Sequence, residues 1–159
     1  MKALLALGMA SLLAAPAAAA DTSNRKAEAL LWYDAFDANK PALLDKILDQ
    51  AWVDIPSPPS ERAGPEAAKA LLSGLRSAFP DFAIKVDEVL QDGDKVVVRS
   101  TISATSRGPF MGFPPTGRSM KIQAVDIHEF KNGKIIRTWH TEDWMTGLRE
   151  LGLMKEASQ

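Results

Sequence analysis

The sequence has no cysteine, one tyrosine and two histidines among its 159 residues. Without cysteine the chain has no disulfide, no thiol nucleophile and no thiolate metal site, so packing must supply its stability. A zinc site needs three or four converging ligands, and the strand pattern described below predicts the two histidines on opposite faces. We therefore expect neither a metal nor a cofactor.

The sequence also lacks an excess of basic charge. Lys2 is the only charged residue among residues 1–20, so without that segment 18 basic residues stand against 20 acidic ones. A chain with this balance has no basic field to hold nucleic acid. Nucleic acid is therefore not an expected partner.

The chain has one long uncharged apolar stretch, Ala3 to Ala15, and it is shorter than the roughly 20 residues that span a membrane. Lys2 precedes it, and Ala17 to Ala20 offers A-x-A cleavage choices before Asp21. These three parts together predict a secretory signal peptide over residues 1–20. We expect a secreted or periplasmic protein without a membrane anchor after cleavage. The 139 residues of 21–159 suit a single domain.

Apolar spacing and proline positions predict three helices before most of the strands. A proline-rich loop from Pro56 to Gly64 reads as a connection within one domain. The expected helices are Ala27–Ala38, Pro41–Leu48 and Pro65–Phe79, and a short strand is expected at Ala51–Ile55.

After Pro80 the pattern changes to strands. Asp92-Gly93 and Asn132-Gly133 supply the positive φ angles that tight hairpin turns need. The expected strands are Phe82–Leu90, Lys95–Ser106, Met120–Phe130 and Lys134–Trp144. Helices followed by a strand meander predict an α+β domain, in which a curved antiparallel sheet closed by three N-terminal helices forms a cone with a pocket.

Several motifs carry a family resemblance. The segments GPFMGFPPTGR (108–118) and NGKIIRTW (132–139), then Asp143 and Leu151-Gly152, resemble the SnoaL-like polyketide cyclases, also called ester cyclases. The resemblance extends over nearly the whole of residues 21–159. It implies the cone-shaped α+β fold of the nuclear transport factor 2 superfamily, a fold that also hosts ketosteroid isomerases and proteins without catalytic activity.

Asp143 is the first candidate catalytic residue. In the family pattern W-x-x-x-D the acid is the general acid/base, and here Trp139 and Asp143 match that pattern. Strand alternation places residues 139, 141 and 143 on one face, which we expect to line the pocket. The alternative reading makes Asp143 the cap of a helix that begins at Trp144.

Asp126 and His128 form a second candidate group, since they share one face of a strand. Asp126 resembles the aspartate that ketosteroid isomerases place shortly before a Phe-x-Phe-Asn turn, and Tyr33 resembles their first-helix tyrosine. The resemblance implies an oxyanion hole formed by Tyr33 and a protonated Asp126. For His128 a core histidine bonded to Asp126 or to a backbone carbonyl is an equal alternative to a catalytic role.

The chain also departs from both families. The isomerases carry their base just before the proline that ends the first strand, where this chain has Ile55, with Asp54 one step earlier. Many ester cyclases have histidines near this position and before the GPFMG segment, and here neither is present. His140 alternates onto the face opposite Trp139, so we expect a structural or surface role for it.

The expected apolar lining of the pocket consists of Trp52, Phe110, Met111, Phe113 and Trp139. The rigid Pro114-Pro115 loop is expected to fold over one end of the cone, as a structural turn, as a contact loop, or as both.

Two functions remain open. The first is an exported enzyme that removes a proton next to the carbonyl of a small hydrophobic compound, followed by aldol-type cyclisation or isomerisation. The second is a periplasmic protein that binds a small hydrophobic ligand in the same pocket without catalysis. A homodimer formed through the outer face of the sheet is compatible with either.

Overall fold

The computed structural model describes residues 24–57 and 63–154. The predicted signal peptide and part of the proline-rich loop lie outside these residues. In the described part no helix is both long and apolar enough to cross a membrane.

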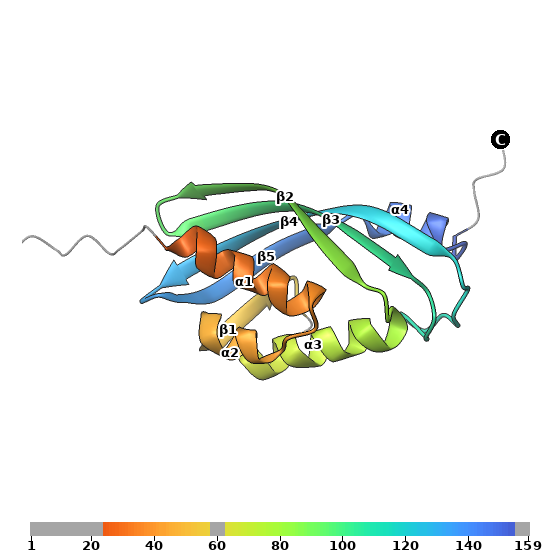
Figure 1. Ribbon diagram of the computed structural model, residues 1–159, viewed down its shortest axis with the longest axis horizontal. Helices are drawn as coiled ribbons and strands as arrows, with labels where there is room; N and C mark the ends of the chain where they lie inside the picture. Colours follow the sequence, from red (N-terminus) through yellow and green to blue (C-terminus); the bar gives the residue numbers. More distant parts are fainter. Residues whose placement is uncertain (1–23, 58–62, 155–159) are drawn as a thin grey trace, which may run out of the picture.

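A five-stranded sheet of order β1-β5-β4-β3-β2 forms the body of the molecule (Figure 1). Strands β2 to β5 form an antiparallel meander, and β1 pairs in parallel with β5. The strands are β1 (Leu48–Ile55), β2 (Ala83–Asp92), β3 (Lys95–Thr105), β4 (Ser119–Lys131) and β5 (Lys134–Glu142). The α+β class with a curved sheet is confirmed, and the parallel β1 is an addition to it.

Two tight turns fix the meander, and both had been expected from the sequence. Asn132 and Gly133 have φ angles of 52° and 74°, the left-handed values that a two-residue hairpin between β4 and β5 needs. The β2–β3 turn uses Gly93, with a φ of 55°, and Asp94, one position later than predicted.

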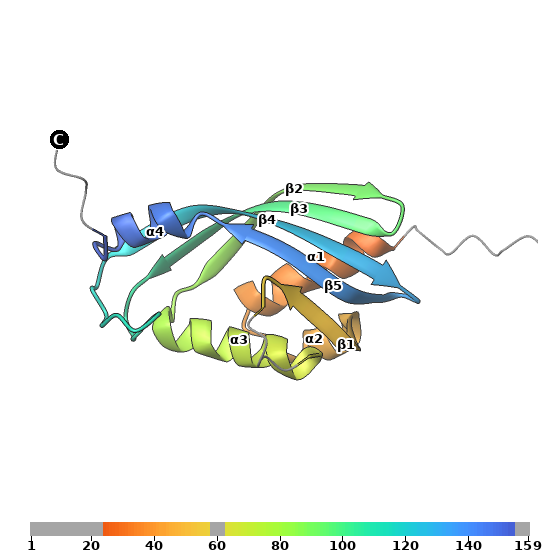
Figure 2. The ribbon, with the colours of Figure 1, turned by 180° about the vertical axis from the view of Figure 1, so that it is seen from behind.

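The three N-terminal helices cover one side of this sheet, and the C-terminal helix lies at one end of it (Figures 1 and 2). Helix α4 follows β5 directly, so the last strand ends at Glu142 and not at Trp144 as predicted. The helices are α1 (Arg25–Asp37), α2 (Ala42–Ile47), α3 (Pro65–Ala78) and α4 (Trp144–Glu150). Pro65 begins α3, and Ala68 and Leu72 on one helical face are buried.

The loop from residue 107 to 118 is held against the end of α3. The backbone amides of Arg107 and Gly108 both donate to the Ala78 carbonyl at 2.9 Å. A Cβ at Gly108 would lie 2.3 Å from the Ser77 carbonyl oxygen, so only glycine permits this approach. The same loop brings the Phe110 ring to 4.9 Å from the ring of Phe79, the residue that follows α3.

The interior lies on the face formed by the even-numbered residues of β3 and β4. Along both strands burial alternates strictly, as expected for a sheet with one covered face. Apolar side chains such as Val96, Val98 and Ile122 fill most of this face, whereas Asp126 and His128 are polar residues buried within it. Buried polar groups cost free energy unless they are hydrogen-bonded, so their partners identify the site.

Candidate functional site

A cavity of about 510 Å³ lies between the inner face of the sheet and the helices. Its wall is mostly apolar and includes the aromatic side chains Trp32, Phe36, Trp52, Phe82, Phe110 and Trp144. Its polar lining side chains in the described part of the chain are Asp54, Ser100, Asp126, His140 and Glu142. An apolar cavity with a few converging polar groups is the usual form of a small-molecule site.

The pairing of β4 with β5 decides which side chains face this cavity. Asp126 is directly opposite His140, and Ala124 is opposite Glu142. All four line the cavity, so His140 and Glu142, the even-numbered residues at the end of β5, point inward. The prediction that the odd-numbered face of β5 lines the pocket is wrong.

The prediction of an inner odd-numbered face rested on Trp139. It does not line the cavity; the Arg137 guanidinium carbon lies 5.2 Å from the centroid of its ring. This cation–π contact gives the tryptophan a partner on the other face of the strand. Trp139 is therefore not part of the cavity wall, contrary to the prediction.

Asp143 also lies outside the cavity. It is exposed, and its Oδ1 accepts a hydrogen bond of 3.1 Å from the backbone amide of Thr146. That bond caps helix α4 and holds the pKa of the Asp143 carboxyl below its usual range. Asp143 is in the position that the capping alternative predicted, and the pocket placement assumed for a general base is wrong.

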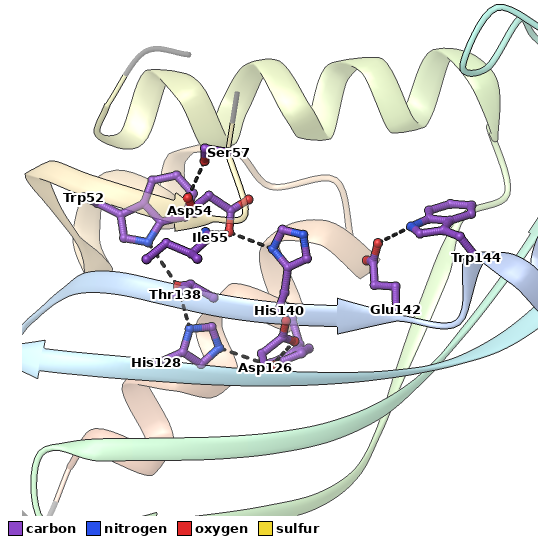
Figure 3. A network of polar contacts seen from close by, with 11 residues as sticks. Trp52, Asp54, Ile55, Ser57, Asp126, His128, Thr138, His140, Glu142 and Trp144 are labelled. Carbon is purple, nitrogen blue, oxygen red and sulfur yellow. Dashed lines mark hydrogen bonds and ion pairs between the residues drawn. The ribbon is translucent and has the colours of Figure 1, made fainter. Parts of the chain in front are cut away.

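His140 and Asp54 form the first polar pair in the cavity (Figure 3). The His140 Nδ1 lies 2.8 Å from the Asp54 Oδ1, across the parallel β1–β5 pairing. This hydrogen bond raises the pKa of His140, because the carboxylate stabilises the imidazolium. His140 lies on the face opposite Trp139 as expected, but this face lines the cavity, so a position on the outer surface is wrong.

The sequence patterns did not predict Asp54 as a site residue, because the isomerase resemblance places the base at the position of Ile55. The missed signal was alternation along β1, which places Asp54 on the same face as Trp52. Trp52 lines the cavity as predicted, and Asp54 lines it with Trp52.

Asp126 lies next to this pair and is 8% exposed. The Tyr33 hydroxyl donates a hydrogen bond of 2.6 Å to the Asp126 Oδ2. Burial raises the pKa of Asp126 to about 6, although the bond from Tyr33 acts in the opposite direction. Tyr33 and Asp126, expected as two donors to one substrate oxygen, are bonded to each other, and Tyr33 does not line the cavity.

His128 is fully buried and also lies outside the cavity wall. Its Nε2 is 3.1 Å from the Tyr33 hydroxyl, and its Nδ1 is 3.0 Å from the Thr138 hydroxyl. Burial lowers the pKa of His128 to about 3, so the ring is neutral at physiological pH. This is the core alternative, with Tyr33 and Thr138 as partners in place of Asp126 or a carbonyl.

Glu142 is a cavity acid that the sequence analysis did not identify. The Trp144 indole N–H donates to its Oε2, and burial raises the pKa of its carboxyl. Its even-numbered position on β5, two residues after His140, is the signal that relates it to the site.

The loop residues divide in two. Phe110 and Met111 line the cavity as predicted, and the Phe110 ring lies 4.9 Å from the Trp144 ring. Phe113 is 40% exposed and does not line the cavity. Its backbone instead exchanges two hydrogen bonds with Phe110, so it shapes the loop and does not form part of the wall.

No group of three or more histidines and acids in residues 24–57 and 63–154 is arranged to hold a metal ion. What the wall does hold is a carboxylate with a raised pKa, Asp126, beside a histidine–carboxylate pair. In an apolar surrounding such groups exchange protons near neutral pH.

Comparison with known proteins points to one family. The profile of the SnoaL-like polyketide cyclases matches residues 27–151. No protein with a curated description matches the chain.

Solved structures agree with that match. TsrD from Streptomyces laurentii is 25% identical with a TM-score of 0.78, covering 84% of this chain and 98% of its own. A putative polyketide cyclase from Bacillus cereus is 26% identical with a TM-score of 0.69, covering 80% of each chain. IdmH, a putative polyketide cyclase from Streptomyces antibioticus, is 25% identical with a TM-score of 0.68, covering 79% of this chain and 96% of its own. With the profile match over most of its length, the chain belongs to the SnoaL-like polyketide cyclase family.

Proposed function

We propose that the protein catalyses cyclisation or isomerisation of a small hydrophobic carbonyl compound by removing a proton from the carbon next to the carbonyl. Asp126 is the base, and His140, protonated and paired with Asp54, stabilises the enolate oxygen. Asp143, the base implied by the family pattern, has no part in this scheme.

One observation carries the proposal: Asp126 and His140 are direct cross-strand partners whose side chains both line the cavity. The Cβ atoms of such a pair lie about 4.5–5.5 Å apart. A ligand that contacts one of these groups therefore lies within reach of the other. A base and an oxyanion partner must have this proximity to act on neighbouring atoms of one substrate.

The directions of the pKa changes favour these roles. A carboxylate with a pKa of about 6 is a stronger base than an ordinary aspartate and is mostly ionised at neutral pH. The hydrogen bond to Asp54 raises the pKa of His140, because the carboxylate stabilises the imidazolium. The directions of the two shifts favour the form that each role requires.

The reaction balances without a cofactor. The C–H bond breaks, its proton passes to the Asp126 carboxylate, and the electron pair forms an enolate whose oxygen accepts a hydrogen bond from His140. In an aldol closure the enolate carbon then bonds to a second carbonyl carbon of the same molecule, and the new alkoxide takes the proton back from Asp126. In an isomerisation Asp126 returns the proton to a different carbon.

Deuterium exchange tests the proposal without knowledge of the natural substrate. The probe is 2-tetralone, an apolar bicyclic ketone, and NMR follows loss of its C1 and C3 protons in D₂O. The protein is expected to accelerate this exchange above the buffer rate, with inhibition by 2-naphthol, a stable analogue of the enol.

A binding protein without catalytic activity would behave differently in the same experiment. It would bind 2-naphthol, as followed by quenching of tryptophan fluorescence, and would leave the exchange rate of 2-tetralone at the buffer value. That result would contradict the proposed enzyme and favour a binding protein without catalytic activity.

We also propose that the protein is exported, on the support of the charge, apolar and A-x-A pattern over residues 1–20. Mass spectrometry of the secreted or periplasmic fraction is expected to find a chain that begins near Asp21. A protein recovered only from the cytosol with Met1 or Lys2 at its start would contradict export. The dimer through the outer face of the sheet stays a prediction.

A further inference from the structure

A row of four buried hydrogen bonds leads from Trp52 to the cavity carboxylate of Asp126. The Trp52 indole N–H lies 3.0 Å from the Thr138 hydroxyl, which lies 3.0 Å from the His128 Nδ1. The His128 Nε2 lies 3.1 Å from the Tyr33 hydroxyl, and this hydroxyl lies 2.6 Å from the Asp126 Oδ2. The four residues before Asp126 are each at most 3% exposed, so bulk water does not compete for these contacts.

The chemistry of the two ends sets the direction of the row. An indole N–H can only donate, and an ionised carboxylate can only accept. Thr138 therefore accepts from Trp52, which leaves its own hydrogen for the His128 Nδ1. The His128 Nε2 then carries the ring proton and donates to Tyr33, whose hydrogen goes to Asp126.

The opposite direction is incompatible with an ionised Asp126. With the ring proton on Nδ1, the His128 Nε2 would need the Tyr33 hydrogen. The 2.6 Å contact between Tyr33 and Asp126 would then join two acceptors, unless Asp126 itself carried a proton. An unpaired polar contact of this kind in a dry interior is costly.

We propose that Trp52, Thr138, His128 and Tyr33 form a hydrogen-bond chain of fixed direction, which locks His128 as the Nε2–H tautomer and positions the Asp126 carboxylate. Thr138, His128 and Tyr33 lie outside the cavity wall, so they are positioning residues, whereas Trp52 also lines the cavity. The inference rests on the proposed function in one respect: it takes Asp126 to be the base that the chain serves.

This assignment changes the role of Tyr33. The resemblance to ketosteroid isomerases implied a tyrosine that donates to the substrate oxygen. Here the Tyr33 hydrogen is already committed to Asp126 and its oxygen accepts from His128. Tyr33 therefore acts through Asp126, by favouring the ionised carboxylate against the effect of burial.

Other titratable groups also act on Asp126 and must be held constant in any test. His140 lowers its pKa, whereas Glu142 and Asp54 raise it. Substitutions at Thr138 and Tyr33 leave all three of these groups in place. A change in the pKa of Asp126 in such variants therefore comes from the altered hydrogen-bond chain.

The tautomer of His128 can be observed directly in the unmodified protein. We expect ¹⁵N NMR of histidine-labelled protein at pH 7.5 to show a protonated Nε2 and an unprotonated Nδ1 for His128, with His128→Gln used to assign the signals. A protonated Nδ1 at this pH would overturn the proposal, as would rapid exchange between the two tautomers.

Variants test whether the hydrogen-bond chain affects the pKa of Asp126. Tyr33→Phe is expected to raise the apparent pKa of Asp126 by about one to two pH units, because one hydrogen bond to the carboxylate is lost. Thr138→Val, which removes one hydroxyl two hydrogen bonds further away, is expected to raise it by roughly a few tenths of a unit through weakened cooperativity. Thr138→Ser, which keeps the hydroxyl, should restore the wild-type value.

Carboxyl ¹³C NMR of aspartate-labelled protein measures these values, with Asp126→Asn as the assignment control. Wild-type titration of Asp126 in both Tyr33→Phe and Thr138→Val would contradict the proposal. If the variants fold poorly, the tautomer measurement still decides, because it needs no substitution. If the expected tautomer is present but 2-tetralone exchange is not accelerated, the proposed function is wrong and the hydrogen-bond chain still stands.

Discussion

Burial of Asp126 has opposite consequences for catalysis and for stability. The pKa of this carboxyl rises from 3.8 to about 6 on folding, so the folded protein binds its proton more tightly than the unfolded chain does. The stabilising effect is fully present below pH 3.8 and is lost as pH rises through 6. The protein therefore keeps an ionised, reactive group at the cost of some stability at neutral pH.

Asp126→Asn should reverse that cost, because asparagine stays neutral and still accepts from Tyr33. We expect the free energy of unfolding at pH 8 to increase by about 1–3 kcal/mol, since one pKa unit corresponds to about 1.4 kcal/mol. Urea unfolding at pH 8 and pH 4 measures it, with a small difference expected at pH 4. Equal destabilisation at both pH values would show that ionisation is not the cause.

In the proposed reaction Asp54 is expected to set the alkaline limit of the exchange rate. The exchange rate should rise with pH as Asp126 ionises near pH 6 and fall as His140 loses its proton above that range. Asp54→Asn removes the charge that stabilises the imidazolium, so the alkaline limb should move down toward the ordinary histidine value of about 6.5. The pH–rate profile with 2-tetralone measures this shift.

Asp49→Asn is a matched control for this change. Asp49 is an aspartate of the same strand, and its side chain accepts a hydrogen bond from the backbone amide of Ala51, two residues further along. Its pH–rate profile should equal the wild-type one. An Asp54→Asn profile that also equals the wild-type one would show that His140 does not depend on this pair.

At the scale of the element, strand β5 explains why the sequence predicts the right strands but places Asp143 on the wrong face. Alternation along β5 was correctly expected, but the choice of inner face rested on Trp139 being internal. Period-two patterns give two faces and do not say which is covered. The covering is decided by β1 and the helices, which bring Asp54 and Trp52 against His140 and Thr138.

Helix α4 gives Asp143 its position, and capping is a testable role. Asp143→Ala removes the acceptor for the Thr146 amide, so the midpoint of thermal unfolding should fall by roughly a few degrees. Asp143→Asn should leave it nearly unchanged, because asparagine caps helices about as well as aspartate. Differential scanning calorimetry distinguishes the two, and an unchanged midpoint in Asp143→Ala would exclude a stabilising cap.

For the whole molecule, the fold was easier to predict than the site. Helix periods, prolines and the Asn132-Gly133 turn are local signals, and they predicted the α+β class and most element bounds to within a few residues. The site depends on contacts between distant residues, such as Tyr33 with Asp126 and His140 with Asp54. Local pattern carries no information about such distances, which explains why Asp54, His140 and Glu142 were missed or misassigned.

The central claim is that the acid/base centre of the cavity is Asp126 and not Asp143. The most direct test compares 2-tetralone exchange rates of Asp126→Asn and Asp143→Asn with the wild-type rate at pH 7. We predict a loss of about 100-fold or more in Asp126→Asn, the usual contribution of a general base, and a nearly wild-type rate in Asp143→Asn. Loss of exchange in Asp143→Asn with activity retained in Asp126→Asn would contradict the account.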